Sequence, residues 1–159
     1  MGYENSAGLG VNNYFGTRET GGTVGVETSD NSNHSLSISF TGASLNSSFL
    51  PPVYLPKGAL VKSYRLRVDE AFAISGTSPT VIFGGTAPAT DGIVLTEAEL
   101  EAVGTKTPAS AGTGTWAVGS STGPLTAQKV TKALGGTSPV VSATQGKATL
   151  LVEYVSLAK

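Results

Sequence analysis

The part of the sequence that most limits the fold is a run of alternating apolar and hydroxyl side chains. Leu36, Ile38 and Phe40 alternate with serine at positions 35, 37 and 39 and with threonine at position 41. Successive side chains of a β-strand point to opposite faces, so this run predicts a strand with one buried and one exposed face. The fold must therefore supply a layer that covers the apolar face.

Further strands are predicted along the rest of the chain. The longest candidate runs over residues 60–74, where Tyr64, Leu66 and Val68 share one face and the same parity continues to Ile74. Shorter runs of β-branched, aromatic and other apolar residues predict strands over residues 80–83, 93–95, 140–143 and 148–155.

One short helix is predicted after residues 93–95. Thr96 and Glu99 have the spacing of a capping box, and Gly104 lies where a helix of about two turns would end. Residues 125–134 fit either a helical face or a strand. A turn at Gln145–Gly146 predicts a closing hairpin between the last two strands.

A short motif occurs twice in the chain. Residues 76–79 and residues 136–139 both read Gly-Thr-Ser-Pro, and each copy precedes a short apolar run. The motif is too short to indicate a duplication, so it predicts two similarly placed β-turns.

The composition suits many strands joined by turns. Charged residues make up 13% of the 159 residues, against roughly a quarter in ordinary soluble domains. Glycine accounts for 21 residues, and the chain has no cysteine that could form a disulfide. We therefore expect a mainly β fold, a jelly-roll or related antiparallel β-sandwich with one short helix and an extended N-terminal arm.

Residues 1–33 are predicted to form this arm, in front of a β-sandwich domain of residues 34–159. The arm is rich in Gly, Asn, Ser and Thr and has no hydrophobic period, so it cannot build a core of its own. It is either disordered or ordered by lying on another surface. Tyr14, Phe15 and Arg18 favour the second alternative, because aromatic residues and arginine anchor protein interfaces. These three residues are the candidate partner-binding site.

The sequence offers few residues for catalysis or for holding a metal or cofactor. His34 is the only histidine, and a metal site of His and Cys ligands is excluded by their number. Asp69 and Glu70 are neighbours on a predicted strand, so they point to opposite faces. A calcium site at Asp30 or Asp91 stays open, although neither has ordered Asp-x-Asp spacing. We expect a protein that is not an enzyme and that has no catalytic residues, cofactor or metal.

Nucleic acids and membranes are not expected partners. The ten basic residues are scattered and the net charge is −1, so no basic patch is predicted. No apolar run approaches the ~18 residues of a membrane-spanning helix. The N-terminus lacks the basic and apolar regions of a signal peptide, so we expect synthesis in the cytoplasm.

Trp116, the single tryptophan, lies in a stretch rich in Gly, Ser and Thr over residues 105–123. If it is exposed, its ring could stack on a sugar. The alternatives are ordinary packing and an interface anchor.

Three passages of the chain resemble phage head decoration (cement) proteins, the small auxiliary proteins that bind the outside of tailed-phage capsids. The first is Gly-Leu-Gly-Val-Asn-Asn-Tyr-Phe-Gly-Thr-Arg at residues 8–18, followed by a glycine pair at 21–22. The second runs from Leu-Pro-Pro at 50–52 to Leu-Pro-Lys-Gly-Ala at 55–59. The third is the strand at 61–72 with its Asp-Glu-Ala-Phe ending, then Gly-Thr-Ser-Pro and Val-Ile-Phe-Gly at 81–84. None of the three passages contains a catalytic motif.

The resemblance implies a jelly-roll or related sandwich on the exterior of a virion. Such a protein would assemble as a homotrimer, with a dimer as the alternative, and would bind the major capsid protein. Its role would be to stabilise the shell by bridging capsomers. Another virion component, in the tail, fibre or neck, is the alternative function, and a carbohydrate-binding module is a further one.

Overall fold

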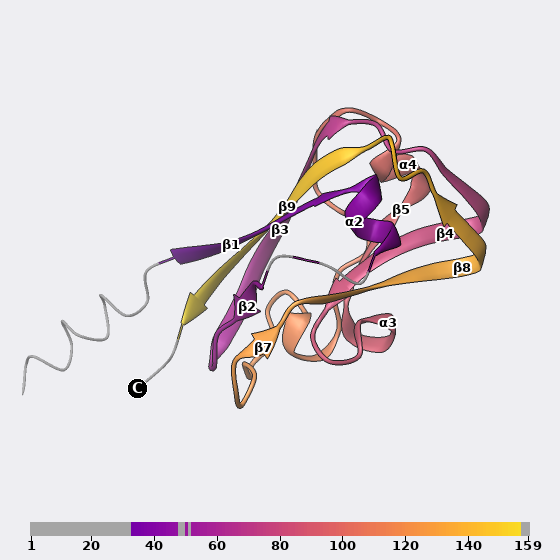
Figure 1. The fold of residues 1–159 in the computed structure, drawn as a ribbon. Helices are drawn as coiled ribbons and strands as arrows, with labels where there is room; N and C mark the ends of the chain where they lie inside the picture. Colours follow the sequence, from indigo (N-terminus) through magenta and orange to yellow (C-terminus); the bar gives the residue numbers. More distant parts are fainter. Residues whose placement is uncertain (1–32, 48–49, 51, 157–159) are drawn as a thin grey trace, which may run out of the picture. The chain divides into compact units, whose positions relative to one another are not determined.

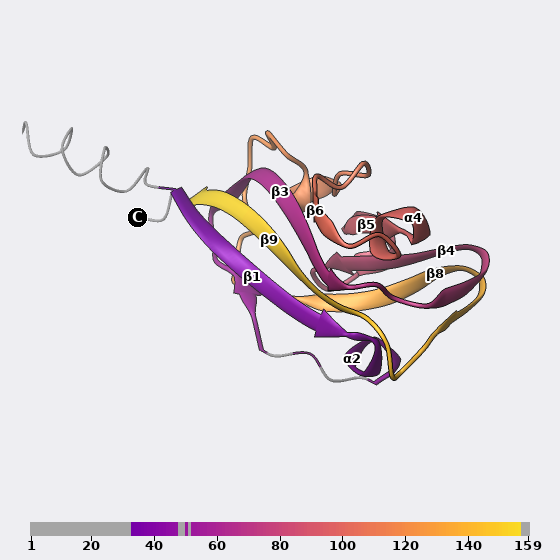
Figure 2. The same ribbon diagram turned by 90° about the horizontal axis from the view of Figure 1, so that it is seen from above.

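The structure is a computed structural model that describes residues 33–47, 50 and 52–156. Most of these residues lie in antiparallel β-strands, which form two layers (Figures 1 and 2). None of the helices in the described ranges is long and apolar enough to cross a membrane.

The first layer is a four-stranded sheet in the order β1-β9-β3-β6. Its strands are β1 (Asn33–Thr41), β9 (Lys147–Ser156), β3 (Ala59–Glu70) and β6 (Gly104–Lys106). The alternation around Ile38 has the predicted effect, because Leu36, Ile38 and Phe40 are buried while the residues between them are exposed. In β3 a register shift between Val61 and Ser63 changes the parity of the buried positions.

The second layer contains β5 (Ile93–Thr96), β4 (Ile74–Gly84) and β8 (Thr131–Val141), in that order. Two short strands, β2 (Tyr54–Leu55) and β7 (Gln128–Lys129), pair with each other. Only Val130 separates β7 from β8, and its amide donates a 2.8 Å hydrogen bond to the carbonyl of Val53. The β2–β7 pair therefore extends the second layer beyond β8.

The order of the strands is that of a jelly roll. With β7 and β8 counted as one strand, the chain has eight strands in the described residues. The strands follow the order β1-β9-β3-β6 in one layer. In the other layer the order is β2, then β7 with β8, then β4 and β5. Two Greek keys that share two sheets in this way define the jelly roll. The predicted mainly β sandwich is confirmed.

The core lies between the two layers. The ring of Phe40 contacts the rings of Phe72 and Phe83, with centroids 5.5 and 4.8 Å apart. Other buried residues from the facing strands are Tyr64, Leu66, Val68, Val81, Ile93, Leu95, Val141, Ala148, Leu150 and Val152. This packing stabilises the sandwich, since the burial of apolar side chains is the main favourable contribution to the free energy of folding.

The described residues contain three short α-helices where one was predicted. The predicted helix is α4 (Glu97–Leu100), a single turn that begins after Thr96 as expected but without a side-chain cap from it. The other two are α2 (Gly42–Asn46) and α3 (Pro88–Asp91). A capping box does exist, but at Thr41 and Ser44, where it starts α2 directly after β1.

The predicted long strand is two strands. β3 ends at Glu70 and β4 begins at Ile74, because the chain turns at residues 71–73 and the Phe72 amide donates to the carbonyl of Leu100. Phe72 stays buried through this turn, which explains why the hydrophobic parity continued to Ile74. The ambiguous segment over residues 125–134 contributes strands β7 and β8.

The prediction of two separate β-turns is wrong. The two Gly-Thr-Ser-Pro copies lie opposite each other inside β4 and β8. Thr77 pairs with Thr137, with register shifts on both sides. Ser78 and Ser138 have φ of 49° and 51°, a left-handed conformation that is uncommon outside glycine. A Cβ on Gly136 would lie 2.5 Å from the Ser78 carbonyl oxygen, so this close approach needs glycine.

Candidate functional site: the outer face of the four-stranded sheet

The outer face of the four-stranded sheet is formed by the residues that alternate with its core positions. The register places Ser37 of β1 beside Leu151 of β9, and Leu151 beside Arg65 of β3. The neighbouring row contains Ser39, Thr149, Arg67 and Thr105. Hydroxyl groups thus cover one side of the face, and two arginines stand on the other.

A shallow hollow lies beside the two arginines. The Arg67 Nε donates a hydrogen bond of 2.6 Å to Oδ1 of Asp69, in an ion pair whose side chains are 69% and 31% exposed. Among the described residues, no acidic side chain forms an ion pair with Arg65. The hollow has a volume of ≈ 370 Å³ and is lined by Arg65, Arg67, Asp69, Thr105, Thr149 and Leu151. Because guanidinium groups bind carboxylates well, it suits an acidic group of a partner protein.

Strand β1 is a long edge of the same sheet. It has nine residues, and no strand of the described part of the chain pairs with its other side. The pairing with β9 runs from Asn33 to Thr41 without a register shift. On the outer face, the Ser39 Oγ lies 3.1 Å from the Thr149 Oγ1. Such an edge presents backbone N–H and C=O groups to a further strand.

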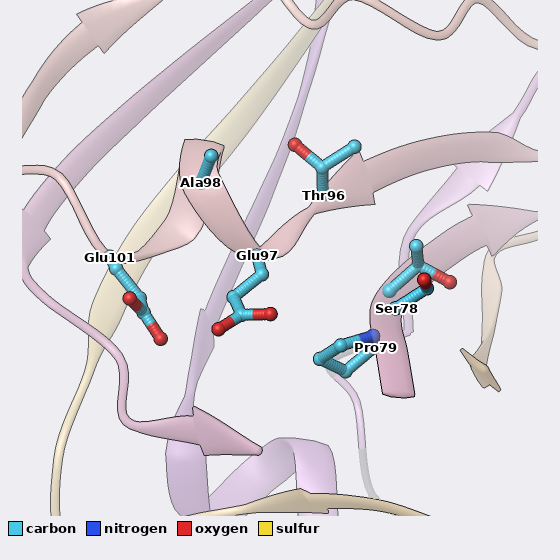
Figure 3. A pocket seen from close by; sticks show the side chains of 7 residues that line it. Ser78, Pro79, Thr96, Glu97, Ala98 and Glu101 are labelled. Atoms are coloured by element: carbon cyan, nitrogen blue, oxygen red, sulfur yellow. The ribbon is translucent and has the colours of Figure 1, made fainter. Parts of the chain in front are cut away.

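A second hollow lies between β4 and α4 (Figure 3). Its volume is ≈ 340 Å³. Glu97 and Glu101 extend on the same side of the helix in Figure 3, and Pro79 faces them from β4. The remaining lining residues are Ser78, Thr80, Thr96 and Ala98. Neither histidine nor lysine is among the residues that line this hollow.

Trp116 is a core residue and not an exposed platform. It ends a short 3₁₀ helix over Gly114–Trp116, and its side chain is fully buried. The indole Nε1 donates a 3.1 Å hydrogen bond to Oε1 of Gln128. A sugar could reach the ring only if this loop left the core, so the residue that favoured a carbohydrate-binding module gives it no support.

The remaining candidates for chemistry are dispersed. The His34 ring stacks on the ring of Tyr154, with centroids 5.5 Å apart. Asp91 belongs to α3, on another part of the domain. In residues 33–47, 50 and 52–156, no cluster of three or more His, Cys, Asp or Glu side chains could hold a metal ion.

The predicted partner-binding residues Tyr14, Phe15 and Arg18 lie outside the described residues, as does Asp30. The arginine hollow and the β1 edge were not predicted as sites. The sequence does contain features that point to both sites. Arg65 and Arg67 occupy the polar positions of an alternating strand, and residues 33–41 contain no charged residue. Only the strand order shows that the arginine hollow and the β1 edge belong to the same sheet.

Comparison of the chain with models of protein families, with curated proteins and with solved structures finds no match.

Proposed function

We propose that this protein is a virion structural protein that binds the outer surface of a tailed-phage capsid and stabilises the shell by bridging capsomers. The observation that carries the proposal is the outer face of the four-stranded sheet, with its hydroxyl rows, arginine hollow and open β1 edge. These groups suit contact with another protein surface and supply no nucleophile–base pair. The jelly roll is a fold of viral capsid proteins, although lectins and cupins share it and fold alone does not determine function.

The proposed role requires no chemistry. A capsid under internal pressure is strengthened by clips that join neighbouring capsomers, and many copies turn modest contacts into strong total binding. Each contact needs about 1,000 Å² of buried surface to be specific. The protein would be made in the host cytoplasm, bind the major capsid protein and associate with further copies of itself. No enzymatic activity, cofactor, nucleic acid or membrane belongs to this proposal.

The N-terminal segment supplies the proposed anchor. Tyr14, Phe15 and Arg18 are of the types that dominate binding energy at interfaces. We expect their side chains to bind the capsid or an adjacent copy, while the sandwich bridges the capsomers.

Cosedimentation of the full chain with capsids that lack it tests this proposal. The double variant Tyr14→Ser, Phe15→Ser should bind about a thousandfold more weakly, because two hot-spot aromatic residues at about 2 kcal/mol each contribute about 4 kcal/mol. The matched control is Tyr54→Ser, whose side chain is 49% exposed on the domain, and it should bind as the natural chain does. Equal binding by the double variant would show that the anchor is elsewhere. No binding by the natural chain would remove the proposed function itself.

A further inference from the structure

The edge of β1 lacks the features that usually protect a long edge strand. Proteins protect such edges with charged residues, proline, bulges or a covering element. Residues 33–41 read Asn-His-Ser-Leu-Ser-Ile-Ser-Phe-Thr, without charge or proline, and their pairing with β9 has no bulge. Three of the other edge strands are much shorter, with two residues in β2, four in β5 and three in β6. The eleven-residue β8 also ends a sheet, but it contains Lys132 and Pro139 and has register shifts in its pairing with β4. Among the strands of residues 33–47, 50 and 52–156, none pairs with this edge, so it is the one that we consider for an added strand.

We propose that β1 pairs with β1 of a second copy of this chain, antiparallel and about a two-fold axis at Ser37. Strand addition at a sheet edge gives affinity through main-chain hydrogen bonds. An interface around a two-fold axis brings the same patch of both copies together, so the patch must complement itself.

The sequence of β1 meets this requirement. Centred on Ser37, the pairing places Ser35 opposite Ser39 of the partner subunit and Asn33 opposite Thr41 of the partner subunit. All nine residues of the strand are then used. Hydroxyl groups oppose hydroxyl groups on the outer face, as Ser39 and Thr149 already do within one copy at 3.1 Å. No like charges meet, because the strand has none. Cross-strand hydroxyl pairs stabilise such a ladder.

The dimer would join two outer faces into one continuous sheet. Each Arg65 lies in the row of Ser37 and Leu151. Five strand spacings would separate the two Arg65 residues, or about 24 Å at ~4.8 Å per spacing. A partner would therefore meet two arginine hollows related by the two-fold axis.

Cysteine cross-linking of the purified full chain tests the pairing and its register. The chain has no cysteine, so Ser37→Cys places a single thiol on the proposed axis. Mild oxidation should give a disulfide-linked dimer within minutes at micromolar concentration. Ser35→Cys and Ser39→Cys are the matched controls: neither should cross-link alone, and a mixture of the two should form the mixed dimer. If Ser37→Cys stays monomeric, or all three variants cross-link equally, the proposal is overturned.

A second variant tests the association without chemistry. Ser35→Glu, Ser37→Glu, Ser39→Glu places three pairs of like charges across the axis and should weaken the dimer about a hundredfold. In sedimentation velocity the natural chain should have twice its 16.0 kDa mass, and the variant the mass of one chain. Thr105→Glu on β6, at the opposite edge, is the control and should remain dimeric. A natural chain that sediments as a monomer or trimer would contradict the two-fold pairing. Neither test uses a capsid, so the proposed function can fail independently.

Discussion

At the scale of the residue, Tyr64 shows how the sandwich constrains a polar group. Its side chain is 4% exposed and lies on the inner face of β3 among apolar residues. Burial raises the pKa of the phenol above its ordinary value of 10.0, and the neighbouring backbone of Gly112 opposes this effect only in part. Desolvation disfavours the ionised form, so the folded protein keeps Tyr64 neutral in alkali.

This raised pKa predicts a loss of stability at high pH. Below pH 10 the phenol is neutral in both states, and its contribution to stability is fully present. Above pH 10 the unfolded chain loses this proton while the folded protein retains it, so the free energy of unfolding should fall by about 1.4 kcal/mol per pH unit.

Urea unfolding between pH 9 and pH 11.5 measures the fall, with Tyr64→Phe as the test. In this variant the free energy of unfolding should fall less steeply with pH, by about 1.4 kcal/mol per pH unit. A Tyr64→Phe curve parallel to that of the natural chain would show that another group is responsible.

At the scale of the element, the turn between β8 and β9 depends on one glycine. The predicted closing hairpin is wrong, because β8 pairs with β4 in one layer while β9 pairs with β1 and β3 in the other. Gly146 has φ of 98°, and a Cβ at this position would overlap the ring of Phe72. The turn therefore requires glycine for its conformation and for its packing. The sequence predicted the turn from Gln145–Gly146, but only the structure shows that a core ring fills the space beside it.

We expect Gly146→Ala to lower the free energy of unfolding by about 2 kcal/mol or more, since it adds steric overlap to backbone strain. Gly119→Ala is the control, because Gly119 also has positive φ, 79°, but no atom lies within 4 Å of a Cβ there. It should cost only about 1 kcal/mol. Both values come from urea unfolding at neutral pH, and equal losses would mean that the overlap with Phe72 relaxes freely.

Local patterns predicted the elements better than their arrangement. Alternation at Leu36, Ile38 and Phe40 depends on neighbours in sequence, and the strand formed as predicted. The opposition of Thr77 and Thr137 depends on strands sixty residues apart, which no local pattern reveals. Trp116 is similar, because Gln128 provides its partner only after the loop has folded onto the core. The arginine hollow is a product of strand order, so the sequence could supply its residues but not its place.

At the scale of the whole molecule, the described part of the jelly roll has no further strand on the outer face of the four-stranded sheet or along its β1 edge. The inferred β1 pairing uses the edge, and the proposed capsid contact uses the face together with Tyr14, Phe15 and Arg18. Two copies joined in this way would present two hollows at a fixed spacing. A rigid pair of this kind suits a clip between capsomers, because fixed geometry increases the effective concentration of the second contact.

The thermal stability of the capsid tests the proposed function most directly. Capsids that lack the protein should melt at a higher temperature once the full chain is added, with the effect saturating at a fixed ratio of chains to capsid subunits. This rise is expected because a ligand that binds only the assembled shell shifts the equilibrium toward it. An unchanged melting temperature, at concentrations where the chain is folded and in excess over the capsid subunits, would contradict the account.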